Sequence, residues 1–328
     1  MQAVVLGAYG PPSQIQITSL GTPAPADDEV LVRVRATSVN PYDWHHISGR
    51  PYAARLMPGT LGLRSPKIAV AGCDMAGTVE AVGSAVRGFR PGDDVFALLR
   101  EGGFAEYVSV RQDLLAPKPA NLSHEQAAAV PMAAATALLA VRDEGRIEPG
   151  QRGLVTGASG GVGTFAVQLA VAVGALVTGV CGAKNADLVR SLGAKEVIDY
   201  RAEDFTRGGQ RYDFIIDTAG GRPARACRRV LTPKGTLVIV GGPDGRWLRP
   251  VSNVVGALAL APLVPQRITV ADITRHPRPK ALLTTLTELI EAGKVTPVID
   301  RGYPFTDIGE AVGYQYKGHP AGKVVVTL

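Results

Sequence analysis

Apolar residues in the first third of the chain fall into short runs that predict β-strands. The clearest runs are Ala3–Leu6, Glu29–Val39 and Gly77–Val82. Turns rich in glycine and proline, such as Gly10-Pro11-Pro12 and Pro91-Gly92, separate the runs. This part of the chain is therefore expected to be β-rich.

The pattern becomes helical at Ser123, which forms a predicted capping box with Gln126. After Arg152, short apolar strands alternate with helices, an arrangement typical of a parallel sheet covered on both faces. The expected strands are Gly153–Thr156, Leu176–Cys181, Glu196–Asp199, Phe214–Asp217 and Thr236–Val240, and the expected helices are Val162–Val173 and Leu188–Leu192. A later helix at Pro279–Ala292 and a strand at Val324–Leu328 are expected to return to the first domain. The fold class is predicted to be α/β.

Composition narrows the classes of function. A chain of 328 residues exceeds what one core usually supports, so two domains are expected. The net charge of +6 comes from scattered lysines and arginines, which argues against a nucleic-acid partner. Three widely spaced cysteines argue against disulfides and a structural zinc lobe, and favour a reducing, cytoplasmic location. The long uncharged stretches, Gly153–Ala183 and Pro250–Gln266, contain glycines, prolines or polar residues, so no membrane partner is expected.

A glycine-rich turn between a predicted strand and helix carries the strongest chemical signal. Ala158-x-Gly160-x-x-Gly163 is a variant of the dinucleotide fingerprint, in which Gly160 admits the pyrophosphate and Gly163 permits close helix packing. Amides at the helix start would bind the phosphates, although an unrelated glycine turn is the alternative. The residues predicted to bind the cofactor here are Ser159, Gly160, Gly161, Val162 and Gly163.

The end of the next strand indicates which dinucleotide binds. Sites that prefer NAD place a carboxylate there for the ribose 2′-hydroxyl. The segment 180–185 has no carboxylate and contains Lys184, which would attract a 2′-phosphate. NADPH is therefore favoured, the alternative being that Lys184 is a solvated loop charge.

Several further motifs together resemble one family. They are Ser38-Val39-Asn40-Pro41-Tyr42-Asp43-Trp44, Gly72-Cys73-Asp74-Met75-Ala76-Gly77, Gly92-Asp93-Asp94-Val95-Phe96, Gly193-Ala194-Lys195-Glu196-Val197-Ile198-Asp199-Tyr200, Gly293-Lys294-Val295 and Gly322-Lys323-Val324-Val325. Together with the glycine turn they resemble the medium-chain dehydrogenase/reductase superfamily, in its zinc-independent quinone oxidoreductase branch. The resemblance covers nearly the whole chain.

The resemblance implies a GroES-like β-rich catalytic domain (1–124 and 274–328) and a Rossmann NADPH-binding domain (125–273), with the substrate in the cleft between them. It also implies that Thr136, Lys184, Tyr200 and Lys323 contact the cofactor. The implied catalytic residues are Asn40, Tyr42, Asp43 and His45.

Zinc-using relatives place a cysteine at Asn40, a histidine at Cys73 and a third ligand near Met132, so this chain is expected to bind no zinc. Without a metal, hydride from the nicotinamide C4 suits acceptors that delocalise charge. The expected substrate is a small hydrophobic quinone or α,β-unsaturated carbonyl. Candidate hydrogen-bond donors are Asn40, Tyr42, His45 and His46, although both histidines could instead stabilise a loop.

Two other functions stay open at this stage. One is an enoyl-thioester reductase of the same fold, and the other is an NADPH-binding protein with a mainly structural role. A homodimer is expected. The apolar stretch Val251–Val264 could line the substrate cleft, cover a dimer interface or form a packed helix.

Overall fold

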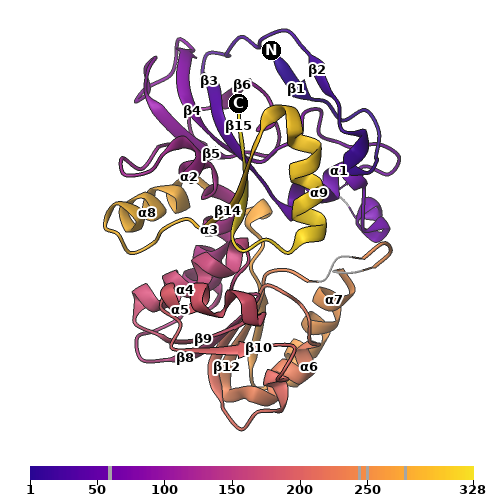
Figure 1. Cartoon of the computed structure of the whole chain (residues 1–328), viewed down its shortest axis with the longest axis vertical. Helices are drawn as coiled ribbons and strands as arrows, with labels where there is room; N and C mark the ends of the chain where they lie inside the picture. Colours follow the sequence, from indigo (N-terminus) through magenta and orange to yellow (C-terminus); the bar gives the residue numbers. More distant parts are fainter. Residues whose placement is uncertain (58–60, 243–244, 249–250, 277–278) are drawn as a thin grey trace. The chain divides into compact units, whose positions relative to one another are not determined.

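The computed structural model describes residues 1–57, 61–242, 245–248, 251–276 and 279–328. The chain divides into two compact units (Figure 1). The first unit comprises Met1–Ala135, His276–Gly293 and Pro297–Leu328, and the second comprises Thr136–Arg275 and Lys294–Thr296. The predicted domain boundaries at 124/125 and 273/274 stay predictions.

The first unit is built on a largely antiparallel seven-stranded sheet, in the order β14-β15-β3-β4-β5-β7 with β6 also paired to β3. Only the β14–β15 pair is parallel among these strands. The strands are β3 (Glu29–Val39), β4 (Asp74–Val82), β5 (Asp94–Leu98), β6 (Tyr107–Arg111), β7 (Leu115–Pro117), β14 (Ile299–Pro304) and β15 (Lys323–Thr327). A separate antiparallel pair is formed by β1 (Gln2–Val4) and β2 (Ile17–Ser19).

Register in this sheet brings three distant segments together. The β15–β3 pairing sets Val324 opposite Val39, so Lys323 lies beside the residue that follows β3, Asn40. The β3–β4 pairing sets Ala36 opposite Ala76 and brings the end of β3 to the start of β4. The helices of this unit are α1 (Pro41–Ser48), α2 (His124–Ala128), the first part of α3 (Pro131–Leu138), α8 (Pro279–Glu291) and α9 (Ile308–Gly318).

The second unit contains the predicted parallel sheet, in the order β10-β9-β8-β11-β12-β13. The strands are β8 (Arg152–Thr156), β9 (Leu176–Cys181), β10 (Glu196–Asp199), β11 (Tyr212–Asp217), β12 (Leu231–Ile239) and β13 (Arg267–Val270). The order reverses between β8 and β11, so α4 (Gly161–Val173) and α5 (Ala186–Ser191) lie on one side and α6 (Ala224–Cys227) and α7 (Val251–Leu260) on the other (Figure 1). This is a Rossmann-type sheet, and the α/β prediction is confirmed.

The capping box predicted at Ser123, which depends only on neighbouring residues, is confirmed. Ser123 accepts a hydrogen bond from the Gln126 amide at 3.2 Å, and the Gln126 side chain accepts one from the Ser123 amide at 3.0 Å. In α7, Ala257 is buried while Val255 and Leu258 are exposed, so the apolar stretch is a helix packed on one face only. Among the helices that the structure describes, none combines the length and apolar character of a membrane-spanning segment.

Candidate functional site

The glycine turn of the second unit joins β8 to α4, with Gly160 as the residue that precedes the helix. Gly157 has a φ of 61°, which favours glycine. A Cβ on Gly163 would lie 2.0 Å from the Gly157 carbonyl oxygen, so only glycine allows this approach of helix to turn. No side chain caps the start of α4, and the first amides of a helix have no acceptor within it. The turn can therefore bind an anion at the helix dipole.

The ends of the neighbouring strands complete this site within the second unit. Asn185 donates a hydrogen bond to Ser159 Oγ at 3.0 Å and so joins the end of β9 to the glycine turn. Lys184 is exposed beside it, and β9 carries no carboxylate at its end. A Cβ on Gly182 would lie 3.7 Å from Tyr200 Cε1, so Tyr200, which is half exposed, flanks the same strand end. The structure therefore brings the predicted turn residues, Lys184 and Tyr200 together.

A set of hydrogen bonds between the ends of β8 and β11, next to the glycine turn, was not predicted from the sequence. Thr156 Oγ1 donates to Asp217 Oδ1 at 2.5 Å, and the Gly220 amide donates to the same oxygen at 2.9 Å. Thr218 Oγ1 donates to the Thr156 carbonyl at 2.7 Å. Burial raises the pKa of Asp217. These bonds tie the end of β8 to the end of β11 and fix the strand end from which the glycine turn departs.

The second group of predicted residues lies at the start of α1 in the first unit. Asn40 precedes the helix, Pro41 is its first residue, and the Asp43 carboxylate accepts a bond from the Asn40 amide at 2.8 Å. Proline at this position and a carboxylate three residues after the cap favour a helix start. The helix ends at Gly49, whose φ is 64°. His45 and His46 therefore lie on this helix, and His45 also contacts the loop after it at the Arg50 carbonyl, in keeping with the alternative that it stabilises a loop.

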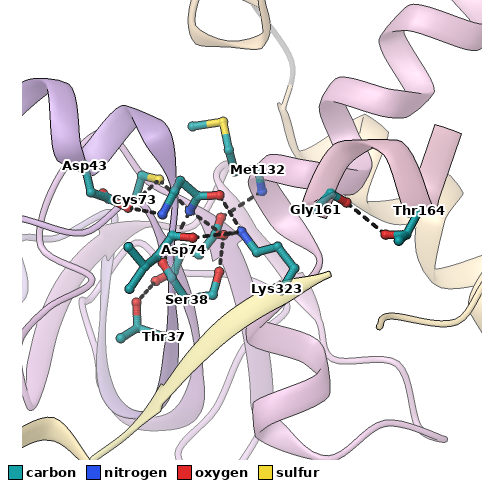
Figure 2. Close-up of polar contacts among 11 residues, drawn as sticks. Thr37, Ser38, Asp43, Cys73, Asp74, Met132, Gly161, Thr164 and Lys323 are labelled. Atoms are coloured by element: carbon teal, nitrogen blue, oxygen red, sulfur yellow. Dashed lines mark hydrogen bonds and ion pairs between the residues drawn. The ribbon is translucent and has the colours of Figure 1, made fainter. Parts of the chain in front are cut away.

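Six side chains form what we call the buried polar cluster (Figure 2). They come from β3, α1, β4, β15 and the residues just before α1 and β4, and they are Ser38, Asn40, Asp43, Cys73, Asp74 and Lys323. Asp74 Oδ1 accepts a bond from the Met132 amide at 2.7 Å. Its Oδ2 accepts from Ser38 Oγ at 2.6 Å and from Asn40 Nδ2 at 2.8 Å, and it lies 3.4 Å from Lys323 Nζ.

Lys323 is 3% exposed, and its ammonium is buried among residues of the first unit. It donates to Asn40 Oδ1 and lies 3.4 Å from the Val39 carbonyl oxygen and from Asp74 Oδ2. These contacts account for its three hydrogens. The assignment of Lys323 to the cofactor stays a prediction.

Asn40 was expected to offer a hydrogen bond to substrate, but the cluster uses both ends of its amide. Oδ1 accepts from Lys323, while Nδ2 lies 2.8 Å from Asp74 Oδ2 and 3.3 Å from both the Ser38 carbonyl oxygen and Cys73 Sγ. An amide nitrogen has two hydrogens, so these acceptors account for both. With 2% of its surface exposed, Asn40 acts here as an internal connector.

Asp43 differs from Asp74 in its surroundings. Its Oδ2 accepts from the Asn40 amide and lies 3.9 Å from Cys73 Sγ, whereas Oδ1 is the one buried side-chain oxygen or nitrogen without a partner in the described part of the chain. Burial, followed by the nearby charge of Asp74, raises the pKa of Asp43 to about 7. The same two influences, burial first and then the carboxylates, raise the pKa of the Cys73 thiol. Asp43 is completely buried, and its assignment as a catalytic residue stays a prediction.

The remaining predicted groups, Tyr42, His45 and His46, also lie on α1. Tyr42 donates through its hydroxyl to the Arg100 carbonyl at 3.2 Å, and burial raises its pKa. His45 Nδ1 lies 2.7 Å from the Arg50 carbonyl oxygen, and His46 Nδ1 lies 3.0 Å from that of Tyr42. Because a carbonyl oxygen only accepts, both histidines carry a proton on Nδ1. His45 can therefore donate from Nε2 only as the imidazolium.

Thr136 lies in α3 and is buried, outside the glycine turn. Its predicted contact with the cofactor stays a prediction. Asp74 and Ser38 were also not singled out from the sequence, although each stands inside one of the motifs already noted. Their importance depends on pairing between β3 and β4, which a sequence pattern does not specify.

The donor set around Asn40 does not fit a zinc ion. Zinc is held by thiolates, imidazoles and carboxylates. Here the one thiol, Cys73, is disfavoured as a thiolate, Asn40 contributes an amide, and the Lys323 ammonium lies against both Asn40 and Asp74. Over the described ranges, no group of three or more histidine, cysteine, aspartate or glutamate residues is arranged to hold a metal.

Comparison with known proteins agrees with this architecture. The family model described as an alcohol dehydrogenase GroES-like domain matches residues 26–120, and the model described as a zinc-binding dehydrogenase matches residues 192–326. The chloroplast envelope quinone oxidoreductase homolog of Arabidopsis thaliana is 33% identical over 99% of this chain and 98% of its own length. The mitochondrial NAD(P)H oxidoreductase of Mus musculus is 35% identical over 92% of this chain and 82% of its own length.

A solved structure shows the same fold. The quinone oxidoreductase of Escherichia coli, complexed with NADPH, matches with a TM-score of 0.84 and 26% identity, over 100% of both chains. A GroES-like unit joined to a Rossmann-type sheet with this glycine turn defines an oxidoreductase of the NAD(P)H-binding class. The chain belongs to the medium-chain dehydrogenase/reductase family, in its quinone oxidoreductase branch.

Proposed function

We propose that the chain is a zinc-independent, NADPH-dependent reductase of quinones or α,β-unsaturated carbonyls. The observation that carries the proposal is the donor set at the start of α1, where the Asn40 amide stands at a ligand position of zinc-using relatives, with one thiol, Cys73, beside it and the Lys323 ammonium bound to its oxygen. An enzyme without a Lewis acid favours an acceptor that spreads the incoming negative charge over a ring or an enolate. The names of two relatives, one a quinone oxidoreductase homolog and one an NADPH-dependent alkenal/one oxidoreductase, support this class of acceptor.

The residues of the second unit fit the phosphates of NADPH. The glycine turn would hold the pyrophosphate, and Lys184 with Tyr200 would lie beside the 2′-phosphate. Bound NADPH supplies the hydride from its nicotinamide C4. The protein must then supply a proton, and His45 as an imidazolium and the Tyr42 hydroxyl are the groups of α1 that we propose for this role.

The direct test follows NADPH oxidation by the purified protein against a panel of acceptors. Benzoquinones, enones and enals are expected to be reduced, and added chelator is expected to leave the rate unchanged. Simple ketones should react at least 100-fold more slowly, because they concentrate the developing charge on one oxygen. Reduction of simple ketones alone, dependent on added zinc, would contradict the proposal. Exclusive reduction of an enoyl-CoA would identify an enoyl-thioester reductase instead.

Lys184→Gln is expected to raise the Kd for NADPH at least tenfold and to change the Kd for NADH less than twofold. Only NADPH carries the 2′-phosphate that the ammonium would contact. Fluorescence titration with each nucleotide measures both constants. Lys195→Gln removes the same charge from another exposed position of the second unit and serves as the control. Equal weakening of both nucleotides would refute the role of Lys184.

The homodimer expected from the sequence stays a proposal. Exposed apolar side chains on α7 and just after it support it, since 60% of Val255, 48% of Leu258 and 78% of Leu263 is accessible in the single chain.

A further inference from the structure

The buried polar cluster contains four ionisable groups, Asp43, Cys73, Asp74 and Lys323, and two of them form an ion pair that a stable core does not need. Asp74 and Lys323 are an ion pair at 3.4 Å, and their side chains are 0% and 4% exposed. Burying such a pair costs desolvation energy that its mutual attraction often fails to offset, so apolar residues of similar volume commonly stabilise a fold equally well. Stability alone therefore does not explain why the first unit buries this pair.

The pair acts on one side chain above all, the Asn40 amide. Lys323 binds its oxygen and Asp74 binds its nitrogen, so the amide is held from both ends. Asp74 is itself held by the Met132 amide and by Ser38 Oγ, at 2.7 and 2.6 Å. Ser38, Asp74, Met132 and Lys323, which come from four segments of the first unit, thus hold the residue that precedes α1, and Figure 2 labels all four.

Helix α1 needs such an anchor because it has only eight residues. Isolated helices of this length are only marginally stable in water, because nucleation is unfavourable and few hydrogen bonds form to offset it. Tyr42 and His45, the groups proposed to deliver a proton, both project from this helix. A small rotation of its first turn would displace both of them by distances that matter for proton transfer.

We propose that Asp74 and Lys323 are a positioning pair, which clamps the Asn40 side chain and thereby fixes the first turn of α1 for catalysis. The kinetic part of this inference rests on the proposed function. The pair does not touch the substrate, and Lys323 in this role is not a ligand of the cofactor phosphates.

The variants Lys323→Met, Asp74→Asn and the double variant test the clamp. Each single variant is expected to lower kcat at least tenfold, with the Kd for NADPH changed less than twofold. The double variant removes both charges, so we expect its Tm to exceed that of Lys323→Met while its kcat stays low. Lys234→Met, at an exposed position of β12, is the control for loss of a lysine. Wild-type kcat in the double variant would show that the pair is only structural. A tenfold weaker NADPH complex in Lys323→Met, with kcat intact, would make Lys323 a cofactor ligand.

A second readout separates the clamp from a simple loss of stability. Four titratable groups lie near the Asp43 carboxyl. They are Asp74, Lys323, the neighbouring Cys73 thiol and, on the same helix, Tyr42. Asp74 raises the pKa of Asp43 and Lys323 lowers it. The midpoint of any Asp43-dependent pH profile should therefore move down in Asp74→Asn and up in Lys323→Met. Shifts of one sign in both variants would contradict the charge arrangement.

The positioning role can be judged even if no acceptor is reduced. In the unliganded protein, the NMR signal of the His45 Nδ1 proton reports its bond to the Arg50 carbonyl. Asp74→Asn and Lys323→Met are expected to shift this signal or hasten its exchange with water, and Lys234→Met is not. An unchanged signal in both cluster variants would overturn the proposal, whereas an inactive wild-type protein with shifted signals would overturn only the proposed function.

Discussion

A Gly163→Ala protein is expected to bind NADPH at least 100-fold more weakly than the wild type and to lose about 3 kcal/mol of unfolding free energy. The added methyl carbon would lie 2.0 Å from the Gly157 carbonyl oxygen and 2.8 Å from its carbon, both of them backbone atoms. Backbone cannot rotate aside as a side chain can, so α4 must move away from the turn, at a cost typical of overpacking. Movement of the helix start also misplaces the amides that would bind phosphate.

Gly160→Ala is the matched variant for this experiment. Its new Cβ would have one close neighbour, the Gly157 oxygen at 3.3 Å, and the backbone at Gly160 is extended, with φ −83° and ψ 175°. We expect the free energy of unfolding to change by less than about 1 kcal/mol. The methyl group would still obstruct the approach of a pyrophosphate. Urea unfolding and NADPH titration measure the two effects separately. Unchanged NADPH binding in Gly160→Ala would show that the dinucleotide does not occupy this turn.

Asp43→Asn is expected to be more stable than the wild type at pH 8, by an amount on the order of 4 kcal/mol, and nearly equal to it at pH 4. The folded protein keeps a proton on Asp43 up to about pH 7, whereas the unfolded chain releases it near pH 4. Between these values the unfolded state binds fewer protons, so wild-type stability falls as the pH rises. Asparagine is neutral at every pH, and its side-chain oxygen can still accept the bond from the Asn40 amide.

Urea unfolding at pH 4, 6 and 8 checks this expectation. The exposed Asp28 supplies the control, because Asp28→Asn removes a carboxylate that has no buried environment. The difference between wild type and Asp43→Asn should develop from pH 4 to pH 7 and then level off. A constant difference over that interval would mean that Asp43 is ionised in the folded protein throughout.

The sequence predicted what depends on neighbouring residues. The glycine turn, the strand and helix around it and the capping box at Ser123 are each specified within about ten residues, and the structure has all of them. The parallel sheet followed from the same local alternation. Helix α1 was overlooked, although Asn40, Pro41 and Asp43 are suitable residues for the first positions of a helix.

Roles that depend on pairing between distant strands could not be predicted. The assignment of Lys323 to the cofactor stays a prediction, but the contact of its ammonium with Asn40, 283 positions away in the sequence, was not foreseen. The contacts of Asp74 likewise require β4 to lie beside β3 and the Met132 amide to lie within hydrogen-bond distance of the Asp74 carboxylate. Hydrophobic patterns predict strands but leave the order and register of an antiparallel sheet undetermined, and these two properties decide which polar side chains meet.

The place of β15 beside β3 also has a consequence for how the molecule forms during its synthesis. The Rossmann-type sheet is complete once β13 has emerged from the ribosome, so this sheet can form while later residues, including Lys294–Thr296 of the same unit, are still being added. The first unit has to wait, with the edge of β3 open, until β15 arrives. Closing so long a loop is slow, and the waiting edge is open to wrong pairing. We therefore expect the Asn40 clamp to be among the last features of the protein to form.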